Sequence, residues 1–145
     1  MKFFTPIIFS ISLAVAPVFA NETVASKEAI IQEAAEISLS DFLWIHRPII
    51  VLADSPDDPR FIKQMSLLRA DLSELAERNA IILTDTDPSL KSALREQLRP
   101  RGFMLVLIGK DGGVKLRKPF PWNVREISRV IDKMPMRRQE INDGG

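Results

Sequence analysis

The sequence predicts an α/β domain with elements in the order β-α-β-α-β-β-α, forming a four-stranded mixed sheet with flanking helices. Three observations lead to this prediction. Residues 47–54, 80–85 and 102–109 are continuous apolar runs, the pattern of strands buried on both faces. Residues 58–78 carry an apolar stripe at helical spacing. Residues 110–113, Lys-Asp-Gly-Gly, have the composition of a tight hairpin turn.

The first 20 residues predict a secretory signal peptide. Lys2 precedes an apolar segment, residues 3–15, and Val18-Phe19-Ala20 is a small-x-small cleavage site, so we expect cleavage after Ala20. An uncleaved membrane anchor is the alternative, which the two prolines and the clean cleavage site disfavour. We therefore expect a periplasmic or secreted protein with no stable membrane anchor after cleavage.

The domain itself is expected over residues 39–136. A polar N-terminal segment, residues 21–38, precedes it and is either a short helix or a loose linker. Residues 39–44 are a helical turn or an extended lead-in to the first strand. Because the helix 58–78 joins the strands 47–54 and 80–85, these two strands should be parallel.

The second half continues with a helix over residues 87–98. The runs 102–109 and 114–120 then form a hairpin around the turn. A last helix spans residues 123–134, with Asn123 as its cap. Residues 137–145 are predicted to be a flexible C-terminal tail.

Composition excludes several classes of function. Of the 20 basic residues, Lys2 lies in the predicted signal peptide, which leaves 19 against 19 acidic residues. This balance argues against nucleic acid and against an anionic membrane surface as partners. The chain contains no cysteine, which excludes disulfide exchange, cysteine peroxidase chemistry and thiolate metal sites.

One segment is similar to thioredoxin. Residues 101–115, RGFMLVLIGKDGGVK, resemble the thioredoxin stretch that runs Arg-Gly-Ile-Pro-Thr, apolar strand, Lys-Asn-Gly, next strand. In that family the proline is cis and faces the active cysteines. Met104 stands in the place of the proline, and residues 55–58, where the cysteine pair would lie, are Ser-Pro-Asp-Asp. The resemblance implies the thioredoxin scaffold without its redox site.

A closer resemblance covers about residues 39–138. The segments that carry it are LSDFLW, RPIIVLADSPDDPRF, TDTDP, LRPRGFMLVLIGKDGGVKLR and DKMPMRRQE. They resemble the domain-of-unknown-function family 4174, which occurs in short exported bacterial proteins and in vertebrate extracellular-matrix proteins. The resemblance implies a peroxiredoxin-like branch of the thioredoxin-like fold and no established activity. It assigns no catalytic residue to this chain.

The carboxyl ends of parallel strands are where ligands gather in such sheets. We expect that edge to bring together residues 55–60, 84–87 and 99–103. Asp58-Pro59 and Asp87-Pro88 are each interpreted as an N-cap followed by proline, which leaves Asp57 and Asp85 as the free carboxylates. The candidate ligand- or partner-binding residues are Ser55, Asp57, Arg60, Asp85, Arg101 and Gly102.

Three functions remain open at this stage. The leading hypothesis is a redox-inactive binding or interaction module for an envelope protein or peptide, with no cofactor. The second is an enzyme that uses carboxylates or a metal and needs no cysteine; it requires Asp57 and Asp85 to converge in one pocket. The third is a structural envelope protein. A catalytic triad is not expected, because His46, the only histidine, precedes the first strand whereas Ser55 follows it.

Overall fold

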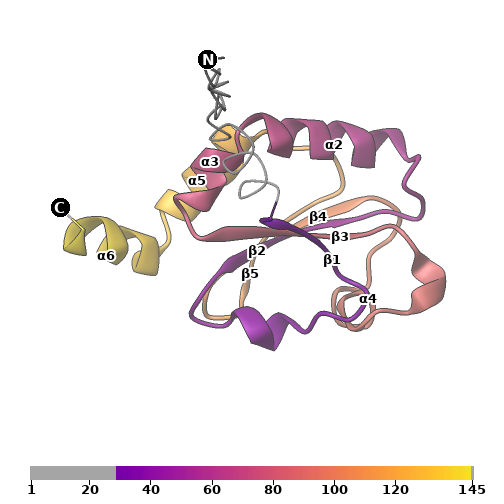
Figure 1. Cartoon of the computed structure of the whole chain (residues 1–145), viewed down its shortest axis with the longest axis horizontal. Helices are drawn as coiled ribbons and strands as arrows, with labels where there is room; N and C mark the ends of the chain where they lie inside the picture. Colours follow the sequence, from indigo (N-terminus) through magenta and orange to yellow (C-terminus); the bar gives the residue numbers. More distant parts are fainter. Residues whose placement is uncertain (1–28, 145) are drawn as a thin grey trace, which may run out of the picture.

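The computed structural model describes residues 29–144 and has a mixed β-sheet with helices on both of its faces (Figure 1). The predicted signal peptide, residues 1–20, lies outside the described residues, as does the first part of the polar segment, residues 21–28. In the part of the chain that the structure describes, no helix is both long enough and apolar enough to cross a membrane.

Five strands form the sheet in the order β1-β3-β2-β4-β5. Their bounds are Ile31–Glu33 (β1), Arg47–Leu52 (β2), Ala80–Asp85 (β3), Met104–Ile108 (β4) and Val114–Lys118 (β5). Strands β1, β3 and β2 are parallel, β4 is antiparallel to β2, and β5 is antiparallel to β4. This topology confirms the predicted thioredoxin-like arrangement, and it has one strand more than expected.

The additional strand is β1. The sequence predicted a short helix or a linker over residues 21–38, which is wrong for Ile31–Glu33. The Ile82 N–H donates to the Ile30 carbonyl at 2.7 Å, and the Ala34 N–H donates to the Thr84 carbonyl at 2.9 Å. Only three residues pair with β3, and two of them are exposed and polar. The strand is therefore specified by pairing with β3 rather than by its own pattern.

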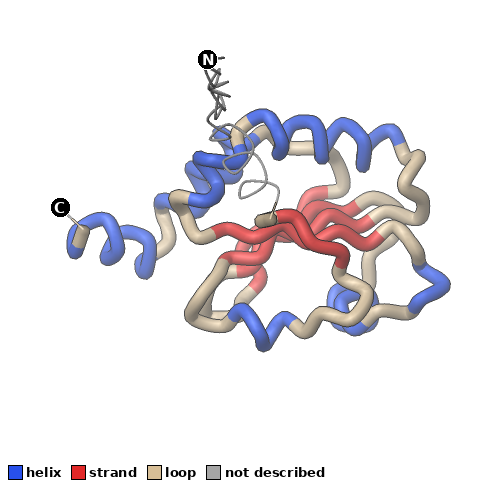
Figure 2. Tube along the Cα trace, viewed as in Figure 1, coloured by secondary structure: helices blue, strands red, loops and turns tan. Residues whose placement is uncertain are grey.

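The helices differ from prediction in where they break. The predicted helix 58–78 is two helices, α2 (Pro59–Ala70) and α3 (Leu72–Ala76), separated at Asp71. The predicted helix 87–98 is a 3₁₀ turn, η2 (Pro88–Leu90), followed by α4 (Ala93–Leu98). The remaining elements are η1 (Leu39–Phe42), α5 (Val124–Asp132) and α6 (Pro135–Asp143). Helices α2, α3 and α5 cover one face of the sheet, and η1 and α4 lie on the other (Figure 2).

The flexible tail predicted for residues 137–145 is instead helical through Asp143. Helix α6 extends away from the sheet at one end of the molecule (Figure 1). It has no buried residue, so an apolar stripe could not have revealed it. Its attachment to the rest of the protein is ionic, as described below.

The core has two halves because successive strand residues point to opposite faces. Ile49 and Val51 of β2 pack with α2, α3 and α5. Ile50 and Leu52 pack with α4 on the other face. All four residues are fully buried, as the continuous apolar run predicted.

The strand register places the ends of β2 and β3 and the start of β4 at the same edge of the sheet. Leu52, the last residue of β2, pairs with both Asp85 of β3 and Met104 of β4. We call this end of the sheet, with residues 53–58, 86–92 and 99–103, the carboxyl edge. The opposite end, with residues 43–47, 109–113 and α6, is called the far edge.

Candidate functional site

The loop between β2 and α2 forms the centre of the carboxyl edge. The Ser55 Oγ accepts a hydrogen bond from the Asp57 N–H at 3.1 Å. Asp58 caps α2, because its Oδ1 accepts from the Arg60 N–H at 2.9 Å. The capping role predicted for Asp58 is confirmed, and Asp87 likewise accepts from the Ser89 N–H at the start of η2.

Asp58 and Arg60 also form an ion pair. The Arg60 Nη2 lies 2.9 Å from Asp58 Oδ2, and its Nε lies 3.1 Å from Oδ1. These hydrogen bonds lower the pKa of the Asp58 carboxyl. Arg60 therefore neutralises Asp58, whereas the exposed Asp57 carboxylate has no hydrogen bond or ion pair within the described residues.

Asp85 is not the free carboxylate that the sequence predicted. Only 7% of the residue is exposed, and internal donors occupy both of its carboxylate oxygens. Oδ1 accepts from Arg95 Nε at 2.9 Å and from the Asp87 N–H at 3.1 Å, and Oδ2 accepts from the Ser92 hydroxyl. The same Arg95 also donates to the Ala53 carbonyl. Asp85 thus fastens the end of β3 to α4 and, through Arg95, to the end of β2.

The segment before β4 brings a further candidate to this edge. Gly102 has φ +64°, a conformation that favours glycine, and a Cβ placed on it would lie 3.6 Å from Arg60 Nη2. The Arg60 guanidinium also lies over the Phe103 ring, 5.7 Å from its centroid. The structure therefore brings Ser55, Asp57, Arg60 and Gly102 together around the start of α2. Arg101 is exposed beside them and lines none of the hollows described below.

Three adjoining hollows run along the carboxyl edge. The first, about 470 Å³, is formed by residues 54–60. The second, about 280 Å³, lies between β1 and α2, and the third, about 240 Å³, lies beyond the ends of β1 and β3. The second and third share Glu33, Thr84 and Thr86, and Pro56 of the second is the neighbour of Ser55 and Asp57 in the first. We call these hollows together the carboxyl-edge groove.

The groove carries more negative than positive charge. Its carboxylates are Glu33, Asp54, Asp57, Asp58, Asp85 and Asp87, and its cations are Arg60 and Arg69. Asp58 and Asp85 are paired with arginines, and Asp54 lies 3.9 Å from Arg95. Glu33, Asp57 and Asp87 have no ion pair within the described residues. Glu33 was missed because β1 was not predicted, so nothing in the sequence placed it at this edge.

The arrangement does not favour catalysis by carboxylates. Asp57 and Asp85 line different hollows, so the convergence that the enzyme hypothesis requires does not occur. Among residues 29–144, no group of three or more histidine, cysteine or acidic side chains is arranged to hold a metal ion. His46 lies at the far edge and is therefore remote from Ser55. Its ring packs edge to face with Phe42, with 6.1 Å between the ring centroids.

The far edge has an ionic cluster that the sequence analysis did not predict. Arg47 is fully buried. Its guanidinium donates to the Arg78 carbonyl at 2.8 Å and to both Glu140 oxygens, at 3.0 Å and 3.3 Å. Lys110 Nζ lies 2.7 Å from Glu140 Oε1. The available signal was a single arginine at the head of an apolar strand, which requires a buried partner.

Glu140 is strongly acidic in this setting. Partial burial alone would raise the pKa of its carboxyl, but hydrogen bonds from Arg47 and Lys110 outweigh it and lower the pKa from 4.5 to about 2. Arg137 adds a third cation, with Nη1 3.5 Å from Glu140 Oε2. Glu140 thereby attaches α6 to β2 and to the β4–β5 turn.

Comparisons with known proteins identify a family for this chain. The sequence profile of the family described as "Domain of unknown function (DUF4174)" matches residues 38–140. Coiled-coil domain-containing protein 80 of Danio rerio is 29% identical over 133 residues, which covers 71% of this chain but only 15% of that protein. The chain therefore matches a small part of this much longer relative.

Two solved structures are similar at lower identity. Thioredoxin peroxidase I of Plasmodium yoelii is 19% identical, with a TM-score of 0.48 over 71% of this chain and 80% of that one. Plasmodium yoelii Prx1a gives the same identity and TM-score, with 81% of its chain covered.

Proposed function

This chain belongs to the family of domain of unknown function 4174, and on that premise we propose that it is an exported binding module that receives a basic protein segment in the carboxyl-edge groove. The observation that carries the proposal is a row of carboxylates in the groove that have no ion pair with any of residues 29–144: Glu33, Asp57 and Asp87. Because the chain contains no cysteine, this edge has no thiol chemistry of its own.

Charge complementarity supports a basic segment as the partner. Lysine or arginine side chains of a bound segment would pair with carboxylates that have no ion pair in this structure. Each such exposed pair adds only about 0.2–1 kcal/mol, so the groove gives a moderate, salt-sensitive affinity. Specificity comes from the spacing of the three carboxylates along the edge.

The position of β1 favours an extended segment. Strand β1 is the last strand on its side of the sheet, and among residues 29–144 no other strand pairs with its outer backbone groups. Extended peptides bind at such edges by main-chain hydrogen bonds. Gln32 and Glu33 of β1 both line the groove, which places the open strand edge and the carboxylates on one path.

Export is part of the proposal. The sequence predicts cleavage after Ala20, which would place the protein in the periplasm or outside the cell, where envelope proteins are its partners. Expression of the full chain in a Gram-negative host, followed by cell fractionation and intact mass, tests this step. A periplasmic species that begins at Asn21 supports export, and a full-length cytoplasmic species contradicts it.

The binding step is tested with short labelled peptides. We expect fluorescence anisotropy to show binding of an alternating Lys-Ala peptide and none of the matched Glu-Ala peptide. The double variant Glu33→Gln/Asp57→Asn should weaken binding about fivefold, because two ion pairs are lost. Raising the salt from about 20 mM to about 150 mM should also weaken it, because exposed charges are screened.

The matched control is Asp41→Asn/Glu77→Gln. It removes the same two charges from exposed residues outside the groove and should leave the affinity unchanged. Equal affinity for the two peptides, or equal weakening by the two double variants, would refute the proposed site.

A further inference from the structure

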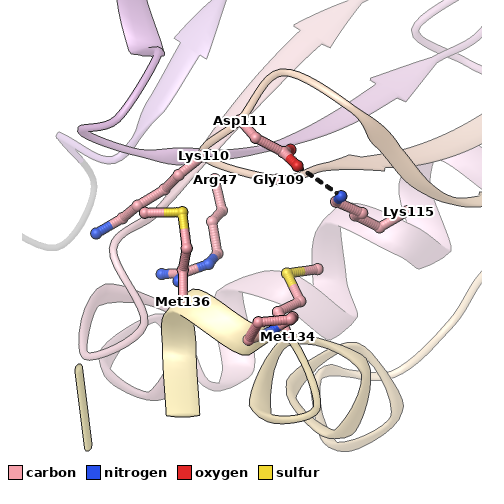
Figure 3. Close-up of a pocket in the computed structure, with 8 residues that line it drawn as sticks. Arg47, Gly109, Lys110, Asp111, Lys115, Met134 and Met136 are labelled. Carbon is pink, nitrogen blue, oxygen red and sulfur yellow. Dashed lines mark hydrogen bonds and ion pairs between the residues drawn. The ribbon is translucent and has the colours of Figure 1, made fainter. Parts of the chain in front are cut away.

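The far edge has a hollow of about 210 Å³ that the proposed function does not use (Figure 3). It is lined by the Gly109–Asp111 turn, by Arg47 and Lys115, and by Met134, Pro135 and Met136 at the start of α6. We propose that this hollow binds a small carboxylate with a short aliphatic chain. Arg47 and its neighbouring lysines would receive the carboxylate, and the methionines would receive the chain.

The first observation is a donor without an acceptor. Arg47 is fully buried, and its two terminal nitrogens bond to the Arg78 carbonyl and to Glu140. Its Nε is buried and has no hydrogen-bond partner in the part of the chain that the structure describes. Buried guanidinium donors are normally all satisfied, so an unpaired N–H in a residue that lines a hollow indicates a missing acceptor.

The second observation is the charge balance. Three cations line the hollow, namely Arg47, Lys110 and Lys115, and Asp111 is its only acidic lining residue. Asp111 pairs with Lys115 at 2.9 Å. Glu140 is shared by Arg47 and Lys110 and also by Arg137. Arg137 does not line the hollow and also lies 3.6 Å from Asp132. The two lining cations Arg47 and Lys110 therefore face the single charge of Glu140, and the one positive charge left over favours an anion.

The third observation is the apolar wall. Met134, the residue before α6, and Met136, in its first turn, both line the hollow together with Arg47 (Figure 3). Methionine side chains are flexible and repack around ligands of differing shape, so they can move to admit a ligand to the shielded Nε. Two thioethers would also suit a soft metal ion, but the surrounding cations oppose one. An amphiphilic anion satisfies both the cations and the methionines.

The volume of the hollow limits the size of the ligand. A dry engineered cavity of about 150 Å³ holds a benzene molecule, so a hollow of about 210 Å³ accommodates a carboxylate with about three to five carbons. Each added methylene that enters the hollow should tighten binding about fourfold, until the space is filled.

The experiment follows the side chains directly in the full-length protein by NMR. Arg47→Lys identifies the Arg47 Nε–H resonance by its disappearance, and labelled methionine methyl groups report Met134 and Met136. Titration with butanoate should shift the Arg47 Nε–H downfield in a saturable way and should shift both methyl groups. Butanamide, which is neutral and of the same shape, should bind at least about tenfold more weakly, and acetate should also bind more weakly than butanoate.

A matched pair of variants locates the site. Met136→Glu places a carboxylate at the hollow and should abolish butanoate binding. Ile141→Glu adds the same charge to an exposed residue of α6 that does not line the hollow and should leave binding intact. An unchanged Arg47 Nε–H resonance at saturating butanoate would overturn the proposal, and so would equal affinity for butanamide. The first result would mean that the hollow takes no carboxylate, and the second would mean that its cations do not recognise one.

Discussion

Glu140 is the carboxylate that three cations share. Arg47, Lys110 and Arg137 approach it from β2, from the β4–β5 turn and from its own helix. Arg47 is fully buried, so loss of Glu140 would leave a buried charge without its carboxylate. Removing one partner of such a pair typically costs several kcal/mol. The free energy of unfolding should therefore depend on this one side chain.

We predict that Glu140→Gln lowers the free energy of unfolding at pH 7 by about 3 kcal/mol. Folding lowers the pKa of Glu140 from 4.5 to about 2, so its contribution is fully present above pH 4.5 and is lost as the pH falls toward 2. Urea denaturation at a series of pH values should show a shallower loss of stability over this range in the variant than in the wild type. Parallel pH profiles would contradict the assignment.

Asp58, Asp85 and Arg47 show which roles of a residue can be predicted from its neighbours in sequence and which cannot. The cap at Asp58 was predictable because proline follows it and its partner, the Arg60 N–H, is two residues away. The roles of Asp85 and Arg47 were not predictable. The side chains that donate to Asp85 lie 7 and 10 residues away, and the acceptors of the Arg47 guanidinium lie 31 and 93 residues away. Only the folded chain brings these groups together.

Helix α6 differs from the other helices in what holds it. Helix α5 buries four residues against the sheet, whereas α6 buries none. Its contacts with β2 and with the β4–β5 turn are made by Glu140. Its stability should therefore depend on an intact helical backbone that keeps Glu140 in place.

We predict that Arg138→Pro destabilises the protein by about 3 kcal/mol and that Arg138→Ala changes stability by less than about 0.5 kcal/mol. The Arg138 N–H donates to the Met134 carbonyl at 3.0 Å, and proline removes this bond. The Arg138 side chain is exposed, so alanine tests the side chain alone. Thermal unfolding of both variants is the measurement, and two neutral results would mean that residues 137–145 are the flexible tail that the sequence predicted.

Strands were predicted better than helices, for a physical reason. Strands β2, β3 and β4 lie inside the sheet and have apolar residues on both faces, so their sequences identify them. Strand β1 and helix α6 bury little or nothing, and their hydrogen bonds and ion pairs leave no periodic pattern. The apolar stripe continues past Asp71 to the buried Leu72 and Leu75, so periodicity does not reveal the break there. Helix α4 starts at Ser92, whose Oγ accepts from the Arg95 N–H at 3.3 Å, and a cap is not part of an apolar repeat.

At the scale of the whole molecule, the two edges of the sheet have opposite chemistry. Within residues 29–144, the carboxyl edge has carboxylates without an ion pair, and the far edge has a buried guanidinium donor without an acceptor. The central strands that separate them are five or six residues long, and the two sites share no lining residue. Mutations more than about 10 Å apart with no shared partner usually have additive effects on free energy.

We therefore predict that the two proposed sites are independent. Met136→Glu should leave the affinity for the basic peptide unchanged, and Glu33→Gln/Asp57→Asn should leave the affinity for butanoate unchanged. Measuring each ligand in the absence and presence of the other should give equal dissociation constants within error. A difference greater than about threefold would show that the sheet couples its two edges.

The chain contains no cysteine, and this has one further consequence. A single thiol introduced into the chain would be the sole attachment point for a thiol-reactive label. One cysteine on α6 and one beside Ser55, introduced together and labelled with a donor and an acceptor dye, would have no competing native sulfhydryl. Energy transfer between the two dyes would then report the distance between the C-terminal helix and the carboxyl edge.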